Sequence, residues 1–297
     1  MLKQRVITAA VLLLIVAVCL AAPGRWPFAL LITAFISLGA WEWGRLSGLP
    51  EGAARTLGLG FALVGAAAAA LLGWPTRAPE AHSDGWALAW AVYLMAWLLL
   101  AVLALRGGVP AWQAVAADSG LGLARRLAGL VVLGAAWAAA VQVFAHGVYF
   151  LLTLLALVWV ADTGAYIAGK SCGQKFFARK LAPSVSPGKS WEGVLGGMLA
   201  VLALAAACLW ADGHVPAAWG KSFYGVAAQQ WGVAALVPLC LLLAAMSVMG
   251  DLLESLAKRA AGMKDSSQVL PGHGGVLDRI DGLLPVLPVG ALLVALS

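Results

Sequence analysis

The sequence predicts an all-α, polytopic membrane protein with about nine transmembrane helices and a cytoplasmic N-terminus. Three observations favour this class. Of the 297 residues, 63% are hydrophobic and only 11% are charged, whereas a soluble domain has roughly 25% charged residues. Apolar runs close to the length of a membrane span recur along the whole chain. The short alternating segments typical of a membrane β-barrel do not occur in the sequence.

The apolar runs place nine spans. The second, sixth and last are short or interrupted, so a count of eight or ten stays open. The expected spans are 6–22, 27–41, 56–74, 86–105, 127–145, 148–161, 194–210, 233–250 and 282–297. The first run is too long for the apolar region of a signal peptide, so we expect it to be retained as a span. Abundant Gly and Ala within the spans predict close helix packing.

Positive charge is distributed unevenly among the connections. With the N-terminus inside, only Arg25, Arg77 and Lys221 of the nineteen Lys and Arg residues fall in outer loops. This asymmetry follows the positive-inside rule, and it predicts that the polar loops 162–193 and 251–281 face the cytoplasm. We expect residence in a bacterial cytoplasmic (inner) membrane. The chain then divides into N-terminal helices over 1–126 and a region over 127–297 that carries both loops.

The loop 251–281 is unusually rich in charge for so apolar a chain. If residues 250–259 are helical, two carboxylates, a hydroxyl and two cations share one helix face. These residues are Asp251, Glu254, Ser255, Lys258 and Arg259. Asp278 and Asp281 are three residues apart and form a second acidic pair. Such a pattern suits a metal-chelated polyphosphate, and the alternative is a salt-bridge network that ties two spans together.

The residue types in this loop favour one kind of metal. Carboxylate oxygens suit Mg²⁺, which takes one or two carboxylates together with substrate phosphates and waters. Zinc would need sets of His and Cys, which the loop does not contain. The glycines of His273-Gly274-Gly275 would let the backbone approach a ligand closely.

The loop 162–193 carries weaker signals. Asp162 ends an apolar run, where an acid costs about 2.5–3.5 kcal/mol on insertion scales. It therefore needs a cation or a metal as partner, unless this helix end lies in water. Farther on, Ser186 and Lys189 precede the seventh span, and backbone N–H groups at a helix start suit a phosphate. The segment is not a P-loop, because Pro183 stands where the first glycine is required.

The run from Ser255 to Asp281 resembles the signature of the phosphatidate cytidylyltransferases, the CDP-diacylglycerol synthases. It reads Ser255-Leu-Ala-Lys258-Arg259, then Lys264-Asp265, then Leu270-Pro271-Gly-His273-Gly274-Gly275-Val276-Leu-Asp278-Arg279-Ile280-Asp281. Upstream, residues 162–166 and 186–193 are also similar to family motifs, although Gly188 and Ser190 stand where Lys and Thr are more usual. The resemblance covers residues 155–297, and the first five spans agree only in hydropathy.

The resemblance implies that the chain transfers the cytidylyl group of CTP to phosphatidate, giving CDP-diacylglycerol and pyrophosphate for phospholipid biosynthesis. It also implies three sets of residues, of which the catalytic set and the metal-binding set overlap. The expected catalytic residues are Asp251, Lys258, Arg259, Lys264, Asp278, Arg279 and Asp281. The expected substrate-binding residues are Asp162, Ser186, Lys189, Trp191, Glu192, Ser255, His273, Gly274 and Gly275. The expected ligands of Mg²⁺, as one ion or two, are Asp251, Glu254, Asp278 and Asp281.

Two other functions stay open on the residues alone. A transporter or channel for an anionic solute would carry charges at mid-membrane depth in several spans, whereas here nearly all charges lie in loops. Another lipid-phosphate transferase, such as a CDP-alcohol phosphotransferase, would carry a DGxxAR…GxxxDxxxD run that this sequence lacks. The expected partners are CTP, phosphatidate and the lipid bilayer. A homodimer is also considered, and no nucleic acid is expected.

Overall fold

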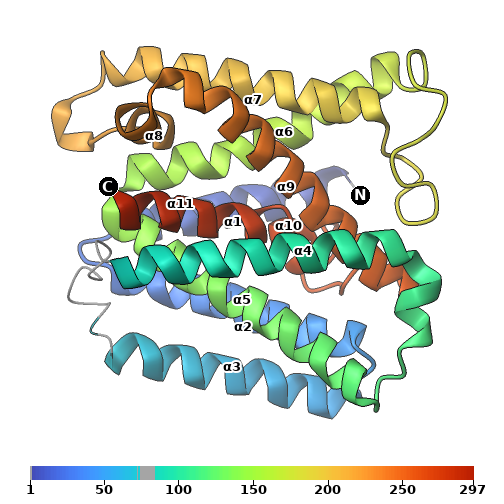
Figure 1. Cartoon of the computed structure of the whole chain (residues 1–297). Helices are drawn as coiled ribbons and strands as arrows, with labels where there is room; N and C mark the ends of the chain where they lie inside the picture. Colours follow the sequence, from blue (N-terminus) through green and yellow to red (C-terminus); the bar gives the residue numbers. More distant parts are fainter. Residues whose placement is uncertain (1, 72, 74–83) are drawn as a thin grey trace.

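A computed structural model describes residues 2–71, 73 and 84–297 of the chain (Figure 1). Helices laid side by side form a bundle, and these ranges contain no β-strand. The all-α prediction is therefore confirmed.

The helices differ widely in length. Their bounds are α1 (Leu2–Ala21), α2 (Trp26–Leu46), α3 (Glu51–Leu71), α4 (Asp84–Ala114), α5 (Gly120–His146), α6 (Val148–Cys172), α7 (Trp191–Asp212), the 3₁₀ turn η1 (Ala217–Trp219), α8 (Phe223–Trp231), α9 (Val233–Ala260), α10 (Leu277–Ile280) and α11 (Leu283–Leu296). Helix α4 is kinked at Gly108, whose φ of 63° lies in the left-handed region that favours glycine.

Seven helices of the described ranges are long and apolar enough to cross a membrane. The first and last predicted spans coincide with shorter apolar helices, Val6–Ala21 and Leu283–Leu296. Each predicted span thus coincides with an apolar helix, and the polytopic class is confirmed, whereas the count of nine crossings is not. The predicted end of the third span at residue 74 and the outer-loop Arg77 lie outside the described residues.

Both polar loops are shorter than predicted. Helix α6 continues to Cys172, so residues 162–172 of the first loop are helical. Residues 191–193 of the same loop belong to α7. Helix α9 continues to Ala260, so residues 251–260 of the second loop are helical. Close packing explains the extension of α6. A Cβ on Gly164 would lie 2.9 Å from the carbonyl oxygen of Gly196 in α7, and a Cβ on Gly196 would lie 3.0 Å from that of Gly164. Tertiary packing here outweighs the weak helix propensity of glycine.

Helix α11 lies inside the bundle, where it packs against α4, α5 and α9 (Figure 1). Its sequence is apolar all round, as is typical of a buried helix. One hydrophobic cluster joins Phe28 of α2 and Trp90 of α4 to Leu154 of α6, Leu243 of α9 and Leu293 of α11. The two predicted regions, 1–126 and 127–297, therefore share a core.

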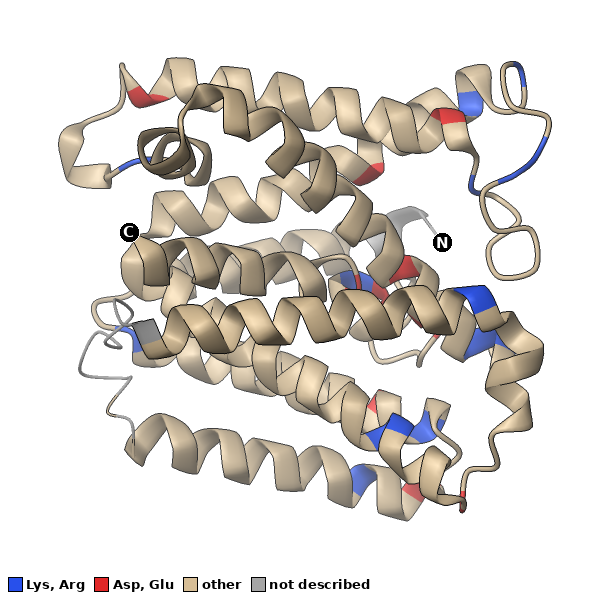
Figure 2. Cartoon of the chain, viewed as in Figure 1, with Lys and Arg blue, Asp and Glu red and all other residues tan. Residues whose placement is uncertain are grey.

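Lys and Arg residues gather at one end of the bundle, where α6 and α9 end and α10 lies (Figure 2). Several Asp and Glu residues lie at the same end (Figure 2). This distribution agrees with the predicted inner side, and it places the residues of both polar loops together.

Candidate active site

The signature segment is built from the end of α9, the connection 261–276 and the short helix α10. A tight turn shapes this connection, because the Leu270 N–H donates to the carbonyl of Gly274 at 2.9 Å. Gly272 and Gly274 have φ angles of 75° and 85°, which favour glycine. The turn brings α10 back against α9, so that the two predicted acidic pairs become neighbours.

Lys258 joins these two pairs. Its Nζ lies 2.6 Å from Oε2 of Glu254 and 2.5 Å from Oδ1 of Asp278, and all three side chains are almost fully buried. The predicted shared helix face is confirmed for Glu254 and Lys258, which are one turn apart. The salt-bridge network considered as an alternative thus exists in the structure, and it includes two of the residues expected to act in catalysis.

Asp278 accepts four hydrogen bonds in all. Its Oδ2 atom accepts from the Ser266 N–H at 3.0 Å, from Ser266 Oγ at 2.9 Å and from the Gly275 N–H at 2.8 Å. Burial raises the pKa of Asp278, but the hydrogen bonds from Lys258 and from the Gly275 N–H outweigh this effect and hold its pKa below the usual range. Asp278 is therefore an ionised carboxylate held in one orientation.

The two glycines of the signature are needed for this arrangement. A Cβ on Gly274 would lie 2.9 Å from Oδ2 of Asp278. A Cβ on Gly275 would overlap with Ser266 Oγ and with the carboxylate of Glu42. In this structure the close backbone approach predicted for both glycines is to protein groups.

The connection 173–190 reaches α9 and supplies the other side of the site. Nζ of Lys189 lies 2.6 Å from Oδ2 of Asp251. Nε of Arg259 donates to the carbonyl of Val185 at 3.4 Å. The other oxygen of Asp251 accepts from Ser255 Oγ at 3.2 Å. The structure therefore joins residues of the two polar loops at one site.

Acidic residues from three elements also influence one another electrostatically. Burial, followed by the charges of Asp251 and Asp162, raises the pKa of Asp281 to about 7, although the N–H of Gly282 donates to its Oδ1 at 2.7 Å. Asp162 lies within α6 rather than at the start of a loop.

Arg279 is exposed, and its guanidinium donates twice to the carbonyl of His273, at 3.0 and 2.6 Å.

Glu192, predicted to bind substrate, organises the connection in this structure. It is buried at the start of α7, and its Oε1 atom accepts the N–H groups of Phe176 and Phe177, both at 3.0 Å. Ser190 caps the same helix by accepting the Gly193 N–H at 3.1 Å. The sequence predicted that backbone N–H groups at this helix start would bind a phosphate. The Gly193 N–H instead donates to a protein group in this structure.

Three other predicted residues lie at the margin of the site. Trp191 is 43% exposed, and the centroid of its ring lies 6.4 Å from that of Phe177. Lys264 is exposed. Ser186 lies in a turn in which its N–H donates to the carbonyl of Ala182 at 2.8 Å. These side chains are accessible or loop-borne, and the structure does not bring them to the buried Lys258 cluster.

Sequence reasoning missed Glu42 of α2, which is completely buried. Its carboxylate accepts from Ser266 Oγ, Ser267 Oγ and the N–H groups of Val276 and Leu277, at 2.5 to 3.1 Å. A signal was present in the sequence, because Glu42 is an acid at the end of the predicted span 27–41 with tryptophan on both sides. An acid in such surroundings needs a partner.

The donor chemistry of the site fits Mg²⁺. No three His, Cys, Asp or Glu side chains in the described ranges converge on a common metal position. Oε1 of Glu254 is nevertheless buried and has no hydrogen-bond partner among these residues, and an orphaned carboxylate oxygen is a suitable metal donor. Mg²⁺ needs only one or two carboxylates when substrate phosphates and waters complete its shell.

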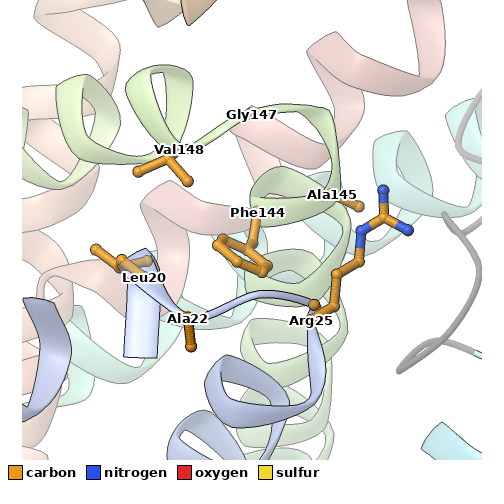
Figure 3. Close-up of a pocket in the computed structure, with 8 residues that line it drawn as sticks. Leu20, Ala22, Arg25, Phe144, Ala145, Gly147 and Val148 are labelled. Carbon is orange, nitrogen blue, oxygen red and sulfur yellow. The ribbon is translucent and has the colours of Figure 1, made fainter. Parts of the chain in front are cut away.

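Two hollows lie at the other end of the bundle. One, of about 390 Å³, is found where α1 ends and α5 meets α6, and Phe144 and Arg25 are among its lining residues (Figure 3). The other, of about 660 Å³, is lined in part by Asp212 and Lys221. Neither hollow is lined by a residue of the signature. The candidate site is therefore defined by its charged side chains and not by one of these two hollows.

Comparison with known proteins identifies the family. The model of the cytidylyltransferase family matches residues 3–297. The chain belongs to the cytidylyltransferase family. This full-length match extends the resemblance from residues 155–297 to the first five spans, including Glu42. It also confirms the prediction of a nucleotidyltransferase.

Curated relatives in this family carry a more specific name. The phosphatidate cytidylyltransferase of Pseudomonas aeruginosa is 42% identical over 303 residues, which cover 99% of this chain and 97% of that protein. The phosphatidate cytidylyltransferase of Haemophilus influenzae is 46% identical over 143 residues, covering 48% of this chain and 44% of that protein. The enzyme of that name from Brucella suis is 45% identical over 134 residues, covering 44% and 41%.

Proposed function

We propose that this cytidylyltransferase family member transfers the cytidylyl group of CTP to phosphatidate, releasing pyrophosphate and forming CDP-diacylglycerol. The observation that carries the proposal is the ion pair of Lys189 with Asp251, which joins the connection 173–190 to helix α9 just before the signature, at the charged end of the bundle. Phosphatidate is an anionic lipid and CTP a soluble polyanion. A charged site at the end of apolar helices can meet both.

The residues of the site suit phosphoryl transfer by positioning and charge neutralisation. The phosphatidate phosphate would attack the α-phosphorus of CTP in line with the departing pyrophosphate. Lys189, Arg259, Lys264 and Arg279 would neutralise phosphate oxygens, because each belongs to the charged end and is only partly covered or exposed. No general base is required, since a phosphate monoester is already largely ionised at neutral pH.

We further propose that the enzyme uses Mg²⁺, as one ion or two. Glu254, with its orphaned oxygen, would supply one ligand, and the neighbouring Asp251 or Asp281 would supply a second. When bound, Mg²⁺ would offset negative charge on the transferring phosphates. Asp278 could join this set only by giving up the Lys258 ammonium group at Oδ1.

We propose the cytoplasmic membrane of a bacterium as the location, with the site at the cytoplasmic face. The loop charges support this orientation, because the charged end of the bundle carries most of the Lys and Arg residues. The curated relatives are from bacteria.

The test uses the purified full chain in mixed micelles with phosphatidate and radiolabelled CTP. We expect pyrophosphate and a labelled lipid to form in equal amounts, to require both substrates, to stop on chelation and to resume with added Mg²⁺. Exchanging phosphatidate for diacylglycerol, or adding an alcohol acceptor with CDP-diacylglycerol, separates this reaction from other lipid-phosphate transfers. Failure to form labelled lipid from phosphatidate would contradict the proposal.

A further inference from the structure

We infer that Glu42 is a positioning residue for the reaction. It acts through the connection 261–276 of the signature, here called the signature connection, rather than on substrate. This inference rests on the proposed function. Glu42 belongs to α2, far from the signature in sequence, and it is 0% exposed. In the part of the chain that the structure describes, no Lys, Arg or His forms an ion pair with it.

Among the residues that the structure describes, the four hydrogen bonds that Glu42 accepts all come from one segment. Its Oε1 atom accepts from Ser267 Oγ at 2.5 Å and from the Val276 N–H at 2.9 Å. Its Oε2 atom accepts from Ser266 Oγ at 3.1 Å and from the Leu277 N–H at 2.7 Å. All four donors lie within residues 266–277, two inside the connection 261–276 and two where it enters α10. A carboxylate that accepts several such bonds fixes the positions of its donors.

The same hydroxyl links Glu42 to Asp278. Ser266 Oγ lies 3.1 Å from Oε2 of Glu42 and 2.9 Å from Oδ2 of Asp278, and the Ser266 N–H also donates to Asp278. Glu42 therefore fixes two features that decide where the Asp278 carboxylate points. One is the position of Ser266, and the other is the backbone that enters α10.

Gly275 shows how tightly this arrangement is built. A Cβ at this position would overlap with both Ser266 Oγ and the Glu42 carboxylate. The glycine is thus required by the approach of α2 to the signature connection. Neutral Gln at position 42 would be isosteric, but its amide NH₂ would face N–H donors, so the connection would have to shift.

A role in stability alone predicts a different result from a positioning role. If Glu42 only tethers α2, its substitution lowers the amount of folded protein and leaves the turnover of the folded fraction unchanged. If it positions Asp278, the folded protein turns over slowly and responds differently to Mg²⁺. Residues that orient active groups in this indirect way are typically worth about 10–100-fold in activity or metal affinity.

The test compares Glu42→Gln with Asp118→Asn, since Asp118 is an exposed acid in the connection between α4 and α5, outside the signature. The activity of the wild-type chain is measured first, because its absence would contradict the proposed function rather than this inference. We expect kcat per folded molecule to fall about 10–100-fold in Glu42→Gln, with the Mg²⁺ midpoint raised and KM for phosphatidate within about threefold of wild type. Asp118→Asn should match the wild type in kcat, in the Mg²⁺ midpoint and in KM for phosphatidate.

Two further variants keep the inference testable if Glu42→Gln does not fold. Glu42→Asp retains the charge and should recover part of the lost kcat. Ser266→Ala removes the hydroxyl shared by the two carboxylates, and we expect it to lower kcat about tenfold. A wild-type kcat and Mg²⁺ midpoint in folded Glu42→Gln, or in Ser266→Ala where the former is not folded, would overturn the inference.

Discussion

Lys189 and Asp251 form an ion pair, with Nζ 2.6 Å from Oδ2, although 61 intervening residues (190–250) separate them in the chain. The pair fastens the connection 173–190 to helix α9. It also places an ammonium group and a carboxylate side by side where a nucleotide phosphate and a cation are proposed to bind. Substrate binding would exchange this internal partner for ligand charges.

Lys189→Met should therefore weaken the binding of CTP. A hydrogen bond to a charged group contributes about 1.5–3 kcal/mol, so we expect KM for CTP to rise about tenfold or more. Initial rates over a range of CTP concentrations measure this effect. Lys175→Met is a matched control, because Lys175 is an exposed residue of the same connection. An equal change in both variants would show that the effect is one of net charge.

Asp278→Asn should abolish turnover and also reduce stability. The substitution leaves the buried Lys258 with Glu254 as its remaining partner, and breaking a buried ion pair typically costs about 3–5 kcal/mol. We expect product formation to fall below detection and the thermal unfolding temperature in detergent to decrease. Near-normal turnover of this variant would remove Asp278 from the reaction.

Gly275→Ala should damage the site although only a methyl group is added. Overpacking typically costs about 1–3 kcal/mol, and here the methyl group would meet Ser266 Oγ and the Glu42 carboxylate. We expect a large loss of activity together with a lower unfolding temperature. Gly52→Ala is the control, since a Cβ at Gly52 meets nothing within 4 Å. Similar behaviour of the two variants would contradict the packing described for Gly275.

Glu192→Ala should destabilise the protein more than it impairs binding. The side chain accepts the N–H groups of Phe176 and Phe177, and charged hydrogen bonds of this kind contribute about 1.5–3 kcal/mol each. We expect a lower unfolding temperature and faster proteolysis within residues 173–190, with KM for CTP changed less than in Lys189→Met. A larger effect on KM than on stability would instead support direct contact with substrate.

Much of the site could be predicted because its signals are local. The i,i+4 spacing of Glu254 and Lys258 predicted a shared helix face, and the structure joins them by an ion pair. The extent of α6 could not be predicted in this way. Its last turns contain Gly164 and Gly169, and they stay helical next to α7, where Gly164 and Gly196 allow close approach. Helix propensity depends only on the local sequence. It therefore does not include the contacts between α6 and α7 that keep these turns helical.

By itself, the sequence determined the membrane class, the location of each apolar helix, the side on which charge gathers and the family signature. Each of these depends on composition or on residues within a few turns of one another. Only the tertiary structure decided that Lys258 also reaches Asp278, that Lys189 reaches Asp251, and that Glu42 holds the connection 261–276. Buried charges must be satisfied by whichever groups the packed helices bring near, and no sequence spacing encodes that choice.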